Sequence, residues 1–320
     1  AAVPVAAAAT TAVAPAVAAA VPVAVLATTA VGPASAEKNL AQSNFRVLYG
    51  DSKEAAKNVP KYQDEIFSAL RRFLCACAQK WGMHEDIAID AFKRIQKEIF
   101  CSHDAREEAL GEVAKTAQRI WTTDEKMPAG PGREFCSVLN EAIRSDDKEL
   151  MAAAMPIIRA INTLCVIRGV RSELQLKYPR DGVCYRGGGL GSAALPFFKV
   201  GTVYRVPGFL ATSFSRDVAE RFLLQSFEGD PDLPCVLWII HLDPRGEANP
   251  VYRCKQVNFV ESSKFGDSEQ EFLFAPYSVF TVRSVELSAR ATYLAPHVIH
   301  LDAAVDNRLE SETLPLAPWY

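Results

Sequence analysis

Residues 261–286 read ESSKFGDSEQEFLFAPYSVFTVRSVE, and two carboxylates, Glu269 and Glu271, stand two positions apart directly before an apolar and aromatic run. The alternation and β-branching over 272–287 predict strand structure, with Pro276 marking a break or an edge position. In an extended strand, residues i and i+2 point to the same face, about 7 Å apart. Two carboxylates placed side by side repel each other unless a cation lies between them or one has a raised pKa. The pair therefore indicates a site for a cationic substrate, or for positive charge that develops in a transition state.

The composition is that of a globular protein with a substantial core. The chain has 320 residues, of which 49% are hydrophobic and 23% are charged, and these fractions are ordinary for such proteins. The length suffices for one large or two medium domains. The formal net charge of -3 argues against a nucleic-acid partner held by bulk electrostatics, while a local basic patch stays open.

Cysteine usage favours free thiols. Most of the cysteines sit in apolar runs and none forms a C-x-x-C pair, so buried thiols in a reducing compartment are the favoured interpretation. A disulfide framework is the alternative, and a zinc site is less favoured without paired ligand spacing. We therefore expect an intracellular, cytoplasmic protein without a metal ion. The eight cysteines are Cys75, Cys77, Cys101, Cys136, Cys165, Cys184, Cys235 and Cys254.

Residues 1–36 form a low-complexity arm of Ala, Val, Thr and Pro, with no charged residue before Glu37. Prolines at positions 4, 15, 22 and 33 divide the arm into pieces shorter than the roughly 20 apolar residues that a transmembrane helix requires. The arm also lacks the basic segment of a signal peptide and the arginines of a transit peptide. We expect it to be disordered or extended, without a transmembrane segment, and able to join the chain to a larger assembly.

Residues 37–132 are expected to form a helical region. Apolar residues recur there, and in the segment that follows, at the three- and four-residue spacing of amphipathic helices. Pro156 is expected to kink the last of these helices or to divide it in two. The expected helices span 62–81, 84–100, 105–121, 133–144 and 148–166.

The pattern changes after Gly169, where short β-rich runs alternate with turn signals. One helix is expected at 218–227. The chain is therefore predicted to have an α+β fold, in which the helical region precedes a mixed β-rich domain at 133–295 and an irregular tail at 296–320. The expected strands span 183–186, 202–206, 236–242, 251–260 and 272–288.

Two further polar motifs precede the carboxylate pair. Tyr185-Arg186-Gly187-Gly188 ends a short strand. An arginine there offers bidentate contacts to a phosphate, and glycines let the backbone approach a ligand. An arginine before a glycine turn is also a common surface feature. Thr212 and Ser213 place hydroxyls where a strand meets a helix, and N-capping by Ser213 or Ser215 is the alternative interpretation.

In combination and in this order, the three motifs resemble the R-S-E class of mono-ADP-ribosyltransferases. Tyr185-Arg186-Gly187 matches the arginine strand of that family, Phe209-Leu210-Ala211-Thr212-Ser213 its F-x-S-T-S strand, and Ser268-Glu269-Gln270-Glu271-Phe272-Leu273 its E-x-E strand. The continuation Phe274-Ala275-Pro276-Tyr277-Ser278-Val279-Phe280 also looks like the family's sequence. The likeness covers residues 133–287 and implies an ADP-ribosyltransferase fold with a mixed, sandwich-like β structure.

The resemblance implies that NAD is a substrate and that ADP-ribose passes to arginine on a protein, with release of nicotinamide. Arg186 would bind the pyrophosphate, with backbone contacts at Gly187 and Gly188. Glu271 would stabilise the positive charge that develops on the ribose. Glu269 would orient the incoming guanidinium and help to remove its proton. The expected catalytic residues are Glu271, Glu269, Arg186 and Ser213, and the expected cofactor-binding residues are Tyr185, Arg186, Gly187, Gly188, Thr212, Ser213 and Phe214.

The sequence departs from the family at Ala211, where the resemblance implies a serine whose hydroxyl helps to hold the catalytic glutamate. Thr212, Ser213 or Ser215 could substitute for that hydroxyl. Phe214, which follows, could stack on nicotinamide or belong to the core. Two alternatives therefore stand beside the transferase. One is an NAD glycohydrolase, in which water replaces the arginine, and the other is an inactive transferase-like domain that binds within an assembly.

Overall fold

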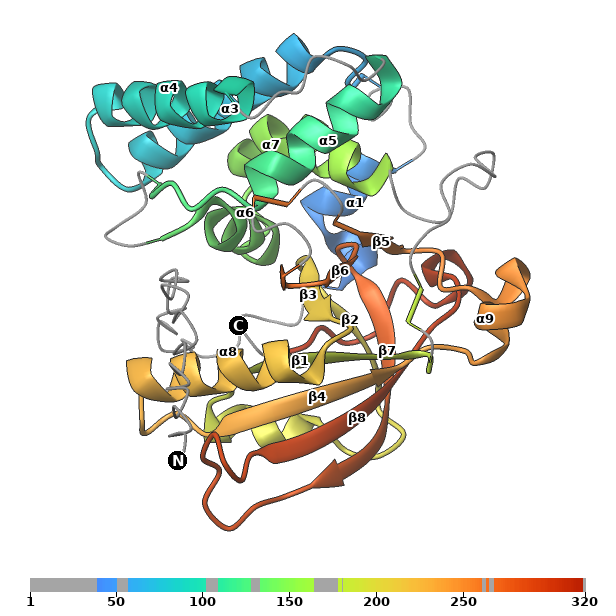
Figure 1. Cartoon of the computed structure of the whole chain (residues 1–320). Coiled ribbons are helices and arrows are strands. Elements are labelled where there is room, and N and C mark those ends of the chain that lie inside the picture. Colours follow the sequence, from blue (N-terminus) through green and yellow to red (C-terminus); the bar gives the residue numbers. More distant parts are fainter. Residues whose placement is uncertain are drawn as a thin grey trace, which may run out of the picture.

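The computed structural model describes residues 39–50, 57–101, 109–127, 133–163, 178–179, 181–260, 263–264 and 268–318. The arm predicted at 1–36 lies outside the described residues. Helices occupy the N-terminal half of the described chain and strands gather in the C-terminal half (Figure 1). The predicted α+β order, a helical region followed by a mixed sheet, is confirmed.

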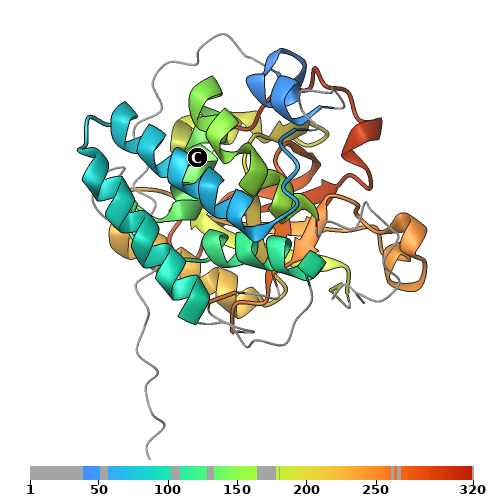
Figure 2. The same ribbon diagram turned by 90° about the horizontal axis from the view of Figure 1, so that it is seen from above.

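The N-terminal helices form because apolar residues recur on one face of each. On α3, the buried face includes Ile66, Leu70 and Phe73, at the spacing of an amphipathic helix. Its charged ends follow the helix dipole, with Asp64 in the first turn and Lys80 in the last. Figures 1 and 2 show the helices gathered on one side of the strands. After a 3-10 turn at Leu40–Gln42, they are α1 (Asn44–Tyr49), α3 (Gln63–Lys80), α4 (Glu85–Cys101), α5 (Ala109–Trp121), α6 (Phe135–Arg144) and α7 (Lys148–Thr163).

Helix α7 continues through Pro156, although a proline inside a helix removes one hydrogen bond. Its neighbours Met155, Ile157 and Ile158 are fully buried. Burial of apolar side chains on both flanks offsets the lost hydrogen bond. The division into two helices, one of the two outcomes expected from the sequence, does not occur.

Within the described ranges, eight strands form one hydrogen-bonded sheet in the order β2-β7-β8-β4-β1-β3-β6-β5. Neighbouring strands are antiparallel, except that β4 and β8 are parallel. The strands are β1 (Val183–Gly189), β2 (Val203–Val206), β3 (Leu210–Ser213), β4 (Cys235–His241), β5 (Val257–Phe259), β6 (Glu271–Phe274), β7 (Ser278–Glu286) and β8 (His297–Ala303). Between them lie α8 (Arg216–Gly229), α9 (Arg245–Ala248) and 3-10 turns at Ser192–Phe197 and Pro250–Tyr252, and a further 3-10 turn at Asn307–Leu309 follows β8.

Three expectations for the strand-rich half differ from the structure. The strand expected at 183–186 continues to Gly189 as β1. Only β5 is extended within the strand expected at 251–260, because a 3-10 turn occupies its first part. The irregular tail expected at 296–320 contains β8, which pairs in parallel with β4 inside the sheet. Pro296 directly precedes β8, where its missing N–H costs the ladder no hydrogen bond. The break expected at Pro276 is confirmed by the turn between β6 and β7.

The sheet changes direction between β1 and β3. These strands share a single register pair, Tyr185 with Ser213, whereas β1 and β4 pair along the whole of β1. In Figure 1, β3 runs crosswise to β1 and β4. One face of β6 packs against the helical region through Leu273, and the other packs into a second core through Phe272. The helical region thus lies directly against the strands that carry the hydroxyl and carboxylate motifs.

Free thiols and the absence of a long apolar helix characterise the described part of the chain. None of the helices described there is long and apolar enough to span a membrane. The free cysteines are the buried Cys77, Cys184, Cys235 and Cys254 and the partly buried Cys75 and Cys136.

Candidate active site

Three adjacent strands bring the arginine, hydroxyl and carboxylate motifs together. β3 lies between β1 and β6 in the sheet. One row of register partners crosses all three strands, from Tyr185 through Ser213 to Glu271. Arg186, the next residue on β1, reaches β3 through a hydrogen bond from its guanidinium to the main chain of Ala211. Directly opposed residues of antiparallel neighbours have Cβ atoms about 5 Å apart, so motifs that are distant in the sequence meet here.

Arg186 is held by the strand beside its own. Its Nη1 donates a 2.9 Å hydrogen bond to the main-chain oxygen of Ala211, and the side chain is partly buried. A guanidinium has five N–H donors in a rigid fork, so this bond orients the group and leaves capacity for an anion. The charge of Arg186 lowers the pKa of Glu271, which places the two groups within electrostatic reach of each other.

The two hydroxyls of β3 point to opposite faces, as strand alternation requires. Ser213 lies in the row with Glu271, and its Oγ donates to the main-chain oxygen of Glu269 at 2.6 Å. Thr212 lies on the other face, where its Oγ1 donates to the main-chain oxygen of Phe272 at 2.6 Å. The structure therefore brings Ser213 to the carboxylate pair. It places Thr212 on the other face, away from the pair, and the role of Thr212 in binding a cofactor stays a prediction.

The two carboxylates do not share one extended strand. β6 begins at Glu271, Glu269 lies in a bend, and Gln270 between them has a left-handed backbone with φ of 45°. Such a backbone is uncommon for a residue other than glycine and tends to occur at functional sites. The charge of Glu269 still raises the pKa of Glu271. The two acids are therefore close, as expected, but a left-handed turn brings them together instead of strand alternation.

Glu271, the carboxylate of this row, has a strongly perturbed acidity. Its pKa is raised to about 7, chiefly by burial and also by the charge of Glu269, while a hydrogen bond from Trp121 and the charge of Arg186 act in the opposite direction. The hydrogen bond runs from the indole Nε1 to Oε1 at 2.9 Å. A partly buried carboxylate whose pKa lies near neutral pH among specific charged partners is typical of a catalytic position.

Glu269 lies between groups of opposite charge. Burial raises its pKa, the Arg221 guanidinium lowers it and the Glu134 carboxylate raises it. Arg221 belongs to α8 and also donates to the main-chain oxygen of Ser268 at 3.5 Å. Glu134 precedes α6 and pairs with Lys126 at 3.0 Å. A carboxylate with a raised pKa is a better proton acceptor at neutral pH than an ordinary one.

Two residues of the helical layer reach this site without having been assigned a role from the sequence. Trp121, the last residue of α5, bonds to Glu271 across 150 positions. Asn140 of α6 brackets the residue before β3, since its Nδ2 donates to the Phe209 oxygen at 3.1 Å and its Oδ1 accepts from the Phe209 N–H at 2.8 Å. A tryptophan at a helix end and an asparagine within a helix form no motif, so no pattern indicated either contact.

The segment that leads into the carboxylate pair is anchored to the same helices. The Lys264 N–H donates to Thr122 Oγ1 at 3.1 Å. The Lys264 ammonium forms ion pairs with Asp124 and with Glu98 of α4, the latter at 2.8 Å. The helical layer therefore holds the chain on both sides of Glu269.

The glycines after Arg186 serve different purposes. A Cβ at Gly187 would collide with the main-chain oxygen of Ala219 on α8, so this glycine allows the helix to pack on β1. The sequence suggested that Gly187 lets a ligand approach the backbone, but α8 occupies the side of Gly187 where its Cβ would lie. A Cβ at Gly188 would make only an ordinary contact, at 3.7 Å from the Trp238 ring.

The two aromatic residues expected at the cofactor pack within the protein. Phe214 stacks on Phe259 and contacts Phe272, with ring centroids 5.5 Å and 4.8 Å away. These contacts favour the core interpretation over stacking on nicotinamide. Tyr185 packs beside Leu223 of α8 in a small third cluster, and its own role in binding a cofactor stays a prediction.

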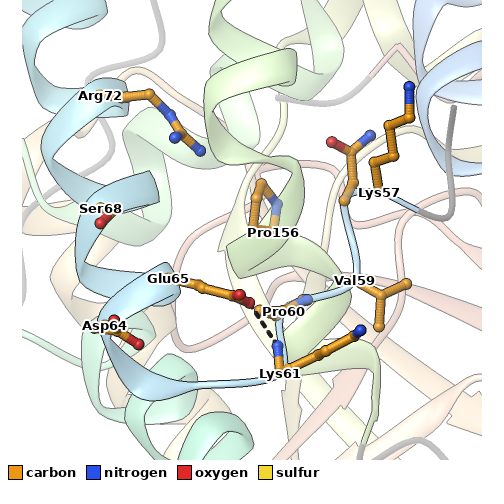
Figure 3. Close-up of a pocket in the computed structure, with 10 residues that line it drawn as sticks. Lys57, Val59, Pro60, Lys61, Asp64, Glu65, Ser68, Arg72 and Pro156 are labelled. Atoms are coloured by element: carbon orange, nitrogen blue, oxygen red, sulfur yellow. Dashed lines mark hydrogen bonds between the residues drawn. The ribbon is translucent and has the colours of Figure 1, made fainter.

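A separate cleft of about 570 Å³ opens within the helical layer. It lies between the segment before α3, α3 itself and Pro156, and Figure 3 shows Lys57 and Arg72 among its lining residues. The Lys61 N–H donates to Glu65 Oε2 there at 2.7 Å. None of the predicted site residues lines this cleft. Its lining residues are Lys57, Asn58, Val59, Pro60, Lys61, Asp64, Glu65, Ser68, Arg72 and Pro156.

The candidate site on β1, β3 and β6, with the residues around it, combines a guanidinium, a hydroxyl, two carboxylates and the indole N–H of Trp121 from α5. A guanidinium recognises phosphates, a fixed carboxylate stabilises positive charge that develops in a reaction, and a second carboxylate accepts a proton. Within the described ranges, no group of three or more His, Cys, Asp or Glu side chains is placed to hold a metal ion.

Solved structures of ADP-ribosyltransferases are similar to this chain. Vis from Vibrio splendidus, in complex with M6 inhibitor, is 18% identical with a TM-score of 0.43, covering 72% of this chain and 87% of that one. HopU1 of Pseudomonas syringae pv. tomato is 15% identical with a TM-score of 0.44, covering 77% and 100%. Exoenzyme S from Pseudomonas aeruginosa, in complex with human 14-3-3 protein beta and carba-NAD, is 14% identical with a TM-score of 0.41, covering 78% and 92%. No protein-family model matches the sequence, and no curated protein does.

Proposed function

We propose that the chain is an ADP-ribosyltransferase that moves ADP-ribose from NAD to arginine on a protein and releases nicotinamide. One observation carries this proposal: Glu271, a carboxylate of raised pKa, lies beside Ser213 and within electrostatic reach of Arg186. The sequence motifs that resemble the R-S-E transferases contribute these three residues.

The first step of the proposed reaction breaks the bond between ribose C1′ and the nicotinamide nitrogen. The electron pair of that bond leaves with nicotinamide, which becomes a neutral base, and positive charge spreads over the ribose ring as in glycoside cleavage. Arg186 holds the diphosphate, and ionised Glu271 faces the ribose. Because its position is already fixed, Glu271 stabilises the charged transition state more than the ground state.

The second step favours arginine as the acceptor because of Glu269. A guanidinium is protonated at neutral pH and must lose a proton before a nitrogen can attack. The nitrogen supplies the electron pair of the new bond to C1′, and the proton goes to Glu269. Burial raises the pKa of Glu269, which favours this transfer. Glu134, whose charge also acts on Glu269, adds to the negative potential that attracts a guanidinium.

Ala211 favours a second candidate, an inactive transferase-like domain that binds within an assembly. It has no hydroxyl where the resembling family has one, and the Ser213 hydroxyl donates to the backbone of Glu269 instead. An NAD glycohydrolase would share the first step of the transferase and pass the ribose to water.

Incubation with NAD labelled in its adenylate part, with and without agmatine as a small guanidine acceptor, separates these candidates. A transferase releases nicotinamide and labels agmatine. Glu271→Gln should abolish both products, and Glu269→Gln should keep nicotinamide release while losing the label on agmatine. Release without any labelled guanidine acceptor would identify a glycohydrolase. Nicotinamide release no greater than that of Glu271→Gln, together with no NAD binding by calorimetry, would identify the inactive transferase-like domain.

A further inference from the structure

The carboxylate of Glu271 is held from the helical layer. The Trp121 indole Nε1–H donates to its Oε1 at 2.9 Å. Trp121 ends α5 and is only 4% exposed. Its ring packs against Phe209, the residue before β3, with 5.0 Å between ring centroids. A buried ring that is fixed by packing presents its N–H in one direction, so the bond constrains the carboxylate as well.

The hydroxyls of β3 are engaged elsewhere. Ser213 Oγ donates to the main-chain oxygen of Glu269 at 2.6 Å and accepts from the Ser215 N–H at 3.0 Å. Thr212 donates its hydroxyl on the opposite face of the strand. Ala211, on the Ser213 face of β3, carries no side-chain donor. The indole N–H therefore supplies a bond to Glu271 that these residues of β3 do not.

We propose that Trp121 is a positioning residue of this site, which fixes the rotamer of Glu271 so that its second oxygen faces the ribose of NAD. This inference rests on the function proposed above. An indole N–H can only donate, so it favours the ionised carboxylate. The other titratable groups that interact with Glu271 are Arg186, Glu269 and the thiol of Cys136 on α6. Of these, Glu269 raises the pKa of Glu271 and so opposes its ionisation. The hydrogen bond from Trp121 lowers that pKa and so favours ionisation.

The residues that follow Trp121 hold Lys264, which precedes the carboxylate pair in the chain. Thr122 accepts a hydrogen bond from the Lys264 N–H at 3.1 Å, and Asp124 pairs with the Lys264 ammonium. The end of α5 therefore holds the side chain of Glu271, and the residues directly after α5 hold Lys264. On this account, the helical layer is part of the site and not only a support for the sheet.

A titration without substrate tests the contact. The chain has four tryptophans, and replacing each with phenylalanine in turn assigns their indole ¹⁵N–¹H signals. The Trp121 signal should shift as Glu271 titrates in the wild type and should stay still in Glu271→Gln, because the acceptor then no longer ionises. A Trp121 signal that does not move between about pH 5 and pH 9, or that moves equally in Glu271→Gln, would overturn the proposal.

Kinetics test the catalytic consequence. Trp121→Phe keeps an aromatic ring against Phe209 and removes the donor. The kcat of nicotinamide release should fall roughly 10- to 100-fold, the equivalent of one hydrogen bond to a charged group, with KM for NAD changed by less than about twofold. The acidic limb of the pH profile should also move to higher pH, since a lost donor raises the pKa of a carboxylate.

Trp81→Phe is the matched control. Trp81 caps α3 and lies against Lys80 and Arg133, so its replacement should leave kcat and the pH profile unchanged. Equal kcat in Trp121→Phe and the wild type would refute the positioning role. Absence of nicotinamide release in the wild type would instead refute the proposed function and, with it, the catalytic role of Trp121. The titration would still decide whether Trp121 and Glu271 are bonded.

Discussion

The proposed reaction needs the ionised form of Glu271, but the burial of this side chain opposes its ionisation. Burial and the charge of Glu269 raise its pKa to about 7, against the opposing effects of Trp121 and Arg186. A group held in this balance changes its charge within the range of pH at which a protein can be assayed. Its titration therefore has consequences for both activity and stability.

Nicotinamide release should depend on the ionisation of Glu271. The raised pKa means that the ionised fraction falls about tenfold per pH unit below about pH 7, and the rate should fall with it. A profile of kcat/KM for NAD measured from about pH 5 to pH 9 checks this expectation. A rate that stays level down to pH 5 would show that ionised Glu271 is not required.

Glu271→Gln should stabilise the folded protein at pH 8 and have little effect near pH 4. The folded pKa lies above the ordinary value of 4.5, so the folded state binds the proton more tightly and stability falls as pH rises from about 4.5 through about 7. A glutamine does not ionise, so the variant avoids this loss of folding stability, which is on the order of 3 kcal/mol at most for a shift of this size. Urea denaturation at both pH values measures it. A destabilising effect at pH 8 would contradict the sign of the shift.

The packing of helix α8 on strand β1 distinguishes the two glycines that follow Arg186. α8 packs directly on Gly187, where a Cβ would collide with the Ala219 oxygen, whereas Gly188 has room for one. Gly187→Ala should therefore destabilise the protein by roughly 1–3 kcal/mol or more, because the helix must move. Gly188→Ala should cost less than about 1 kcal/mol. Chemical denaturation of the two variants compares them, and equal effects would contradict this packing.

Elements with a strong periodic pattern were predictable, and those defined by long-range pairing were less so. The amphipathic spacing located α3 and α4 closely, because burial of one face determines where such a helix runs. β8 was missed because its place in the sheet depends on β4, which lies far away in the sequence. The left-handed Gln270 has no sequence signature either, so the approach of the two acids was expected for the wrong geometric reason.

The core of the whole molecule crosses the boundary expected between residues 132 and 133. Buried residues of α3 and α7 share one cluster with Phe209, Leu273 and Tyr277, which lie on or beside strands of the sheet. Helices and sheet should therefore unfold together. Calorimetry should show one transition with equal calorimetric and van't Hoff enthalpies. Two separable transitions would mean that the helical layer is an independent domain.

For the whole molecule, the resemblance of three ordered motifs to the R-S-E transferases implied that Arg186, Ser213 and Glu271 lie at one site. These residues meet because β1, β3 and β6 are neighbours in the sheet, and each of these strands carries one of the motifs. Trp121 and Asn140 could not be predicted in the same way. Their contacts join segments 150 and 69 positions apart, and only the packing of the helices on the sheet decides them.

We propose above all that Arg186 and Glu271 bind two adjoining parts of one substrate, the diphosphate and the nicotinamide ribose of NAD. A crystal structure of the protein with carba-NAD, whose link to nicotinamide resists cleavage, tests it most directly. We predict the diphosphate within hydrogen-bonding distance of the Arg186 guanidinium and the nicotinamide ribose against the Glu271 carboxylate. A dinucleotide bound elsewhere, such as in the cleft beside Lys57 and Arg72, with Arg186 and Glu271 untouched, would contradict the claim.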